Sequence, residues 1–402
     1  MSKPLPLAGI RVLDLTNVIA GPLASYQLAL MGAEVIKVEV PGVGDLSRKM
    51  GADREAGRRQ MGTSYLAFNS NKKSIALNLK TERGKEVFRR LAKQSDVVLE
   101  NFRPGAMDRL GLSAASLREL NPRLIYCAVS GFGQTGPLSE RASYDQIIQG
   151  YCGLMALTGE PETAPVKAGL VVCDTTAAIT AAFAIAAALV RRAATGEGET
   201  IDVSMLDCAL SSMTSWVISN YLNGGYEARP IGNHSQTSAP SGTFRTGDGP
   251  LNIVNNEQKQ FVATCDALGL PELKTDPRFA ERDDRMRNQA VLKDILEAHL
   301  QIDTAAAWET KLIAAGVPAG PVLSAAQIAE HPQMRERGQL QTVHVPALGR
   351  DVHVVGAGYQ LGGQPLPITA PPPALGQDTD AVLLQAGFAD GEIAALRADG
   401  IL

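Results

Sequence analysis

Several features that assign a function quickly are missing from this 402-residue sequence. The cysteines are odd in number and form no CxxC pair, so the sequence indicates neither a disulfide framework nor a zinc site. The five histidines show no metal-ligand spacing, and no Gly-x-Ser-x-Gly elbow is present. We therefore predict no metal site and find no support for a serine or cysteine nucleophile. The cysteines are Cys127, Cys152, Cys173, Cys208 and Cys265.

A strong charge of either sign is also missing. The sequence has 38 Lys and Arg against 42 Asp and Glu, a formal net charge of -4, which argues against nucleic acid or an anionic membrane as the main partner. The N-terminus lacks the apolar core of a signal peptide. The longest apolar run, 177–190, is shorter than the roughly 20 residues that span a bilayer. We expect a cytoplasmic protein in which this run is a fully buried helix.

Strand and helix patterns alternate through the first half of the chain. Short runs rich in Val and Ile predict strands, and amphipathic or apolar segments between them predict helices. The expected strands are 10–15, 34–39, 73–79, 96–100, 124–129 and 200–203, and the expected helices include 21–30 and 81–93. This alternation is typical of an α/β fold with a parallel, Rossmann-like sheet.

The texture changes after Gly225, where Ser, Thr, Pro and Gly become frequent. Amphipathic patterns follow at 288–299 and 304–315, so we expect a large first segment at 1–225 and a smaller α+β domain at 226–325. Beyond it, the prolines at 371–373 predict a stiff connector that leads to a last helix at 378–385.

Asp174 follows the apolar run 169–173 and precedes the alanine-rich segment 175–190. This pattern predicts a lone carboxylate where a buried, strand-like stretch becomes a helix. Asp is a good N-cap residue, and a cap is the simplest interpretation. The same place suits a nucleophile, because the helix dipole would keep the carboxylate ionised and apolar surroundings would remove its water.

The order of motifs along the chain resembles the class III CoA-transferase family. The resemblance rests on Asp174 together with the segments 17–22, 34–39, 71–74, 100–105, 130–137, 195–198, 276–279 and 316–321. This family contains formyl-CoA, carnitine and dicarboxylate CoA-transferases, with an acyl-CoA racemase as a divergent branch. The resemblance implies an interlocked homodimer, in which 326–402 returns to complete the large domain.

The resemblance also implies an activity and a set of site residues. Asp174 would be the nucleophile, and coenzyme A or acyl-CoA would be a substrate, with no tightly bound cofactor. The family's CoA contacts match Ile19, Ala20, Val40, Leu77, Lys80, Asn101, Phe102, Arg103, Arg109 and Ala142. Val40 departs from formyl-CoA transferase, because a valine cannot hold phosphate as a basic residue does. The second substrate would be a small carboxylic acid, including dicarboxylates.

The segment 131–136 matches GxGxxG after an expected strand, which superficially indicates a dinucleotide site. Pro137 follows, and 138–142 does not open a helix that could carry a pyrophosphate. We interpret the segment as a structural turn, which the resemblance places beside the active site.

Two other functions stay open at this point. One is acyl-CoA racemisation, which needs two acid/base groups on opposite faces of the α-carbon. The resemblance implies a histidine in racemases at the position of Tyr144, and a phenol with a pKa near 10 is a poor proton shuttle. We therefore assign Tyr144 to the substrate pocket. The other alternative is a catalytically silent CoA-binding protein in which Asp174 is a helix cap.

Overall fold

The computed structural model describes residues 4–402, which form two compact units. Of the described residues, the larger unit comprises 4–154, 167–226 and 332–402, and the smaller unit comprises 155–166 and 227–331. The larger unit therefore combines both ends of the chain. The segment 155–166 belongs to the smaller unit, whereas the predicted boundaries leave it in the large domain; within that unit, the Gly232 N–H donates to Gly159 O at 2.8 Å.

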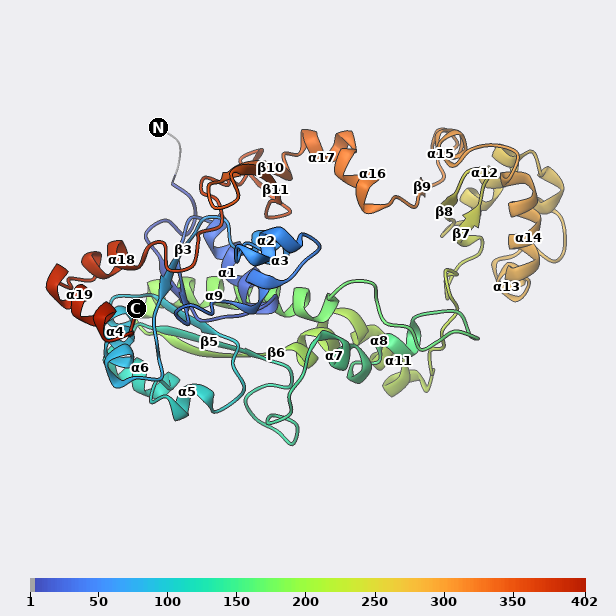
Figure 1. The fold of residues 1–402 in the computed structure, drawn as a ribbon. Helices are drawn as coiled ribbons and strands as arrows, with labels where there is room; N and C mark the ends of the chain where they lie inside the picture. Colours follow the sequence, from blue (N-terminus) through green and yellow to red (C-terminus); the bar gives the residue numbers. More distant parts are fainter. Residues whose placement is uncertain (1–3) are drawn as a thin grey trace. The chain divides into compact units, whose positions relative to one another are not determined.

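The larger unit is built on a six-stranded parallel sheet of order β3-β2-β1-β4-β5-β6 (Figure 1). The strands are β1 Arg11–Asp14, β2 Glu34–Glu39, β3 Lys72–Ala76, β4 Val97–Glu100, β5 Ile125–Ser130 and β6 Glu199–Ser204. Val12 pairs with Val35 on one side and with Val97 on the other, which fixes the central register. The predicted parallel sheet is confirmed. The strand order reverses direction beside β1 and β4, the position at which α/β sheets bind ligands.

Alternate residues of the central strands face different helix layers. Val97 and Leu99 pack with α1 (Ala20–Leu30) and α9 (Val172–Thr195), whereas Val98 packs with the opposite layer. The opposite layer contains α4 Glu82–Lys93, α6 Ala114–Leu120, α18 Thr379–Gln385 and α19 Asp390–Ala398. The C-terminal helices α18 and α19 thus cover one face of a sheet whose strands all come earlier in the chain. α18 is not the last helix, because α19 follows it.

The remaining elements of the larger unit are short. They include η1 Leu46–Lys49, α2 Arg54–Arg58, α3 Thr63–Leu66, α5 Ala106–Arg109, α7 Asp145–Tyr151, α10 Met205–Ala209, η2 Leu210–Thr214, α11 Ser215–Gly224, α17 Pro332–Glu336, β10 Leu340–Val345, β11 Arg350–Val355, β12 Gln360–Leu361 and β13 Gln364–Pro365. Helix α8, Leu154–Leu157, begins at the last residue of this unit's first segment, and its other residues belong to the smaller unit. β10 and β11 form an antiparallel pair that packs on Tyr65 and Leu66 of α3.

The smaller unit has its own core. Its three strands, β7 Ser241–Arg245, β8 Pro250–Val254 and β9 Ala319–Pro321, form an antiparallel sheet. The predicted amphipathic helices are observed as α14 Gln289–Leu300 and α15 Ala305–Ala314. The other helices of this unit include α12 Gln258–Leu268, η3 Pro271–Lys274, α13 Arg282–Arg287 and α16 Ala325–Glu330. Phe244, Phe261 and Trp308 are buried in this core.

Helix α9 differs from the prediction of a fully buried helix. Ala181 and Ile185 are buried, but Phe183 and Val190 are 73% and 74% exposed. The run is apolar on both sides, and only one side meets α1, β5 and β6. Within the described residues, α9 is long and apolar enough to cross a membrane by length and composition alone, although a core helix meets the same criterion.

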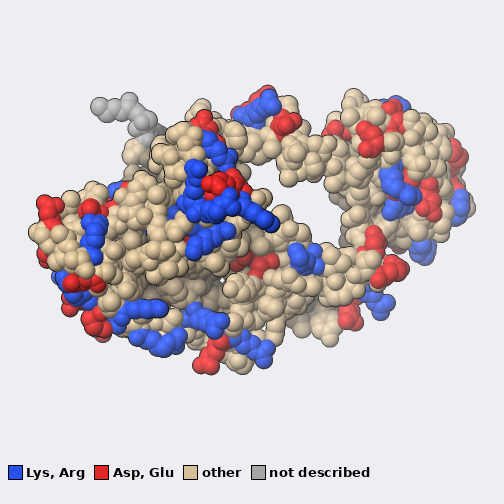
Figure 2. All heavy atoms as spheres, viewed as in Figure 1, with Lys and Arg blue, Asp and Glu red and all other residues tan. Residues whose placement is uncertain are grey.

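Charged side chains are interspersed on the surface. On the face drawn in Figure 2, basic and acidic side chains lie among one another on each unit, without one broad field of a single sign. This distribution agrees with the small net charge.

Candidate active site

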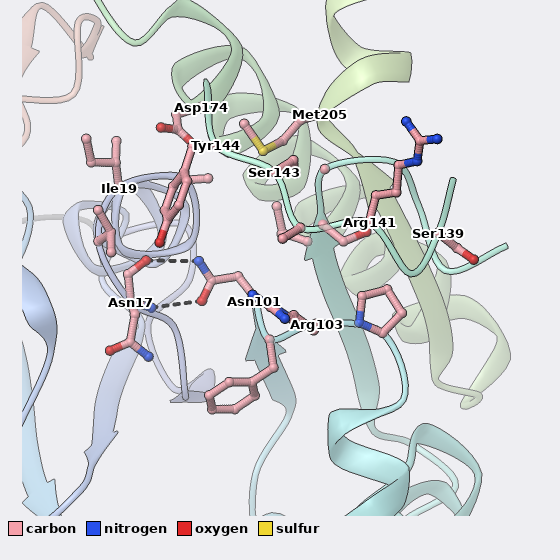
Figure 3. A pocket seen from close by; sticks show the side chains of 18 of the residues that line it. Asn17, Ile19, Asn101, Arg103, Ser139, Arg141, Ser143, Tyr144, Asp174 and Met205 are labelled. Atoms are coloured by element: carbon pink, nitrogen blue, oxygen red, sulfur yellow. Dashed lines mark hydrogen bonds between the residues drawn. The ribbon is translucent and has the colours of Figure 1, made fainter. Parts of the chain in front are cut away.

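A cavity of about 350 Å³ lies where the sheet order reverses, at the carboxyl ends of the strands. This volume is in the range of small-molecule sites. Residues from the loops after β1, β4 and β5 line it, together with the N-terminus of α9 (Figure 3). The lining residues include Asn17, Ile19, Ala20, Asn101, Phe102, Arg103, Ala142, Tyr144 and Asp174. The structure therefore brings most of the sequence-predicted site residues together.

Asp174 is the third residue of α9, and it is not the helix cap. The helix begins at Val172, and the N-cap position is occupied by Val171, whose side chain makes no capping bond. The prediction of a buried strand before Asp174 is also wrong, because Leu170 is 77% exposed in a bend. The run 169–173 looks strand-like because it is apolar, but its residues lead directly into the first turn of α9.

Asp145 caps α9 from a different helix. Its Oδ1 accepts the Cys173 N–H at 2.7 Å and the Asp174 N–H at 3.1 Å. These are two of the first-turn N–H groups that an α-helix leaves unpaired. The Asp174 side chain is consequently not needed as a cap. Within residues 4–402, its carboxylate accepts no hydrogen bond and forms no ion pair.

The ionisation of Asp174 differs from the prediction. Burial raises the pKa of this carboxyl group, and the negative charge of Asp145 raises it further, to about 7. This direction is opposite to the one that we expected from the helix dipole. The neighbouring Cys173 is buried, and burial raises the pKa of its thiol well above the usual range. Cys173 is therefore a packing residue, as the sequence indicates.

The opposite wall is held by a pair of asparagines. The Asn17 N–H donates to Asn101 Oδ1 at 2.8 Å, and Asn101 Nδ2 donates to the Asn17 carbonyl at 2.9 Å (Figure 3). Both polar atoms of the Asn101 amide are used in this way, so its side chain positions the loop after β1. The next residue, Val18, has a φ of 70°, which is unusual for a β-branched residue.

A buried ion pair supports this strained loop. Asp45 Oδ1 accepts the Val18 N–H at 3.1 Å, and the other carboxylate oxygen of Asp45 lies 2.9 Å from Lys37 Nζ. Neither side chain of the pair is exposed to solvent. The sequence analysis assigned no role to Asp45 or Lys37, because their partners are distant in sequence.

Tyr144 enters the cavity because of a close backbone approach. A Cβ atom on Gly131 would lie 1.6 Å from Ser143 Oγ, so only glycine lets the chain before α7 pass the end of β5. Figure 3 shows the Tyr144 side chain extending from beside Asp174 toward the two asparagines. Further residues that no motif indicated also line the cavity, among them Leu46, Ser139, Arg141, Ser143 and Met205. The Arg141 guanidinium is directed away from Asp174 in this view.

A second cavity of about 190 Å³ adjoins the first, and Asn17 and Phe102 line both. Its walls include three more predicted residues, Val40, Leu77 and Lys80. Arg109 lines neither cavity: it is an exposed residue at the end of α5, although we predicted it in the groove.

The chemistry available at this site comes from a carboxylate, hydroxyl groups and arginines. Among residues 4–402, no cluster of three or more His, Cys, Asp or Glu side chains could hold a metal ion. The segment 131–136 forms bends, a turn follows at 137–140, and no helix starts at its glycines. This agrees with our rejection of a dinucleotide motif here. A partnerless carboxylate in a cavity suits covalent catalysis.

Comparisons with known proteins agree with this geometry. The family model described as CoA-transferase family III matches residues 7–379. Over 401 residues the chain is 36% identical to the mouse (Mus musculus) succinyl-CoA:glutarate CoA-transferase, covering 99% of this chain and 90% of that protein. It is 42% identical to the acetyl-CoA:oxalate CoA-transferase of Acetobacter aceti over 336 residues, covering 83% and 85%. The crystal structure of a CAIB/BAIF family protein from Brucella suis matches with a TM-score of 0.85 at 35% identity, covering 96% of this chain and all of that one.

Proposed function

The chain belongs to CoA-transferase family III, and from that premise we propose that Asp174 is the nucleophile of a CoA-transferase reaction. The enzyme transfers CoA between carboxylic acids. The observation that carries the proposal is the free Asp174 carboxylate, which lines the cavity while Asp145 caps the helix.

The reaction starts with attack of an Asp174 carboxylate oxygen on the thioester carbonyl carbon of the donor. The C–S bond breaks, CoA leaves as the thiolate, and a mixed anhydride forms on Asp174. The thiolate then attacks the aspartyl carbonyl carbon and the donor acid leaves, which gives an aspartyl-CoA thioester. The acceptor carboxylate reverses the two steps and regenerates Asp174. Because covalent intermediates conserve the thioester energy, transfer can run close to equilibrium.

We assign CoA to the two adjoining cavities. The larger one contains Asp174, and the smaller one, with Leu77 and Lys80, would hold a part of CoA that does not react. Lys80→Ala should therefore raise KM for acyl-CoA more than it lowers kcat. Arg109→Ala is the matched comparison, because Arg109 lines neither cavity. An equal KM increase in both variants would mean that the groove includes Arg109, contrary to the geometry.

The names of the relatives support a small dicarboxylate as the acceptor acid and a small acyl-CoA as the donor. Those relatives are named for glutarate, oxalate, and D-citramalate transfer with succinyl-CoA or acetyl-CoA donors. Tyr144 would shape the pocket for the acceptor or hydrogen-bond its carboxylate. A phenol in this place disfavours racemisation, since no imidazole lines the cavity to exchange a proton with the α-carbon.

We also propose a homodimer that works in the cytoplasm. Helices α9 and α11 each carry several exposed apolar side chains, which suit a protein interface. They include Phe183, Val190, Trp216, Tyr221 and Leu222, each more than half exposed. The molar mass of the purified protein by light scattering tests this, because a dimer has twice the 42.5 kDa of one chain.

Turnover against a panel of acyl-CoA donors and dicarboxylate acceptors tests the proposed activity. Asp174→Asn keeps the size of the side chain but removes the nucleophile, so the transfer rate should fall by about three orders of magnitude or more while CoA still binds. The matched control is Asp294→Asn, because Asp294 is exposed on α14 in the smaller unit. Full activity of Asp174→Asn would contradict the proposal. A chiral 2-methylacyl-CoA that gains α-deuterium without an acceptor would indicate a racemase.

A further inference from the structure

Asp145 is a buried carboxylate at the start of two helices. Its residue is 6% exposed, and it is the first residue of α7 while it caps α9. The positive ends of both helices therefore meet its negative charge. Because Asp145 accepts the N–H group of Asp174 itself, the backbone of the nucleophile is fixed by a residue 29 positions earlier in the chain.

Gln149, one turn along α7, completes the connection. Its Nε2 donates to Asp145 Oδ2 and, at 3.1 Å, to the Leu170 carbonyl, while its Oε1 accepts the Ala168 N–H at 2.8 Å. Gln149 is 1% exposed. Two side chains of α7 thus hold the whole segment that leads into Asp174, and the neighbour of Asp145, Tyr144, enters the same cavity.

No cation neutralises Asp145. Within residues 4–402 it forms no ion pair, and its partners are two backbone N–H groups and one side-chain amide. The other titratable groups near this end of α9 are Tyr144 and Cys152 from the α7 segment, Cys173, and Asp207 and Cys208 on α10, with Arg103 and Arg141 on the cavity wall. Among all of these, Asp145 is the charge that acts on Asp174.

We propose that Asp145 is a positioning residue that holds Asp174 in place and, through its negative charge, favours the acylated form of Asp174 over the free carboxylate. This inference rests on the proposed function. In the free enzyme, an ionised Asp174 would lie beside the buried negative charge of Asp145, which raises the energy of the ionised pair. When Asp174 forms the anhydride, its charge leaves with the CoA sulfur as the C–S bond breaks. Acylation thereby relieves the repulsion.

The repulsion also affects reactivity before acylation. A carboxylate with a higher proton affinity is a stronger nucleophile, provided that the pH is high enough to ionise it. The acidic limb of the pH profile of kcat/KM reports the ionisation of groups in the free enzyme. With the Asp174 pKa at about 7, the limb of the wild type should lie near neutral pH.

The test compares kcat/KM between about pH 5 and 9 in the wild type, Asp145→Asn and Asp145→Glu. Asn keeps an oxygen that accepts both N–H groups but removes the charge, so ionisation of Asp174 becomes easier. The acidic limb should move about one pH unit lower, and the plateau should fall about tenfold. Glu restores the charge, and its limb should stay where the wild-type limb lies. Gln149→Met is the control for a purely structural loss: it should lower the plateau without moving the limb.

An acidic limb of Asp145→Asn at the wild-type pH would overturn the inference. If the Asp145 variants fail to fold, the carbon-13 signal of the Asp174 carboxyl group in the wild type offers a second test. Its titration midpoint should lie near neutral pH. A midpoint near the ordinary aspartate value of about 3.9 would refute the inference. Full activity of Asp174→Asn would instead refute the proposed function, so the two failures are distinguishable.

Discussion

Helices α1 and α9 begin on opposite sides of the same cavity, and neither has a capping side chain of its own. A carboxylate from elsewhere holds each start: Asp45 accepts the Val18 N–H before α1, and Asp145 accepts two N–H groups of α9. Asp45 is paired with the buried Lys37, whereas Asp145 has no cation. An aspartate therefore holds the start of each helix, but the charge of Asp45 is neutralised by Lys37 and the charge of Asp145 is not.

This difference has a consequence for ionisation on each side. Burial, the largest single influence, would raise the pKa of Asp45, but Lys37 together with the N–H groups of Ser47 and Val18 outweighs burial, and the pKa is lowered. Next to Asp145 there is no such compensation, and the pKa of Asp174 is raised. The fold thus stabilises the wall at α1 and leaves unfavourable charge at α9, where the chemistry is proposed.

Removing the cation at α1 should have the largest effect on stability. Lys37→Met leaves Asp45 as a buried, unpaired charge, which typically costs about 3–5 kcal/mol. Urea unfolding monitored by circular dichroism measures this loss. Lys73→Met on the neighbouring strand is the control, because its pair with Glu34 is partly exposed and contributes about 0–1 kcal/mol. Equal losses in both variants would contradict the role of the pair.

Removing the charge of Asp174 on α9 should instead stabilise the protein at a pH where this carboxyl group is ionised. The pKa of Asp174 is raised on folding, so its contribution to stability is present below pH 4 and is lost as the pH rises through about 7. Asp174→Asn should therefore stabilise the protein by about 1–2 kcal/mol at pH 8 and by almost nothing at pH 4. Urea unfolding at the two pH values measures the difference. A destabilised variant at pH 8 would show that the carboxylate is not held at a cost.

Loss of an ordinary helix cap should have the smallest effect on stability. Helix α4 has its own cap, because Thr81 Oγ1 accepts the Gly84 N–H at 3.1 Å. Thr81→Ala should cost about 1 kcal/mol in urea unfolding and leave the pH profile of turnover unchanged. A moved acidic limb in this variant would mean that any loss of a cap perturbs the site, and the special status of α9 would be lost.

Much of the sheet could be predicted from the sequence. Runs such as 124–129 are apolar and β-branched, and their alternation with helices indicates a parallel sheet. The start of α9 could not be predicted, because an apolar run is compatible with a strand or with the first turn of a helix. The exposed side of α9 was missed for a related reason: both of its sides are apolar, so periodicity does not reveal which one is covered.

The candidate site shows the same division. Asp174, Tyr144 and Asn101, which were assigned to the site from motif matches, line one cavity. They meet there because the carboxyl ends of parallel strands lie at one edge of the sheet. The roles of Asp145 and Asp45 stayed hidden, since each acts on backbone groups that are distant in sequence.

The nucleophilic role of Asp174 is tested most directly by trapping its covalent intermediate. The wild type is incubated with acyl-CoA and no acceptor, treated with borohydride, digested and analysed by mass spectrometry. The account predicts reduction of the acylated aspartate to an alcohol on the peptide that contains Asp174, and no modification in Asp174→Asn. An unmodified Asp174 peptide in an enzyme that still transfers CoA, or an adduct on another residue, would contradict it.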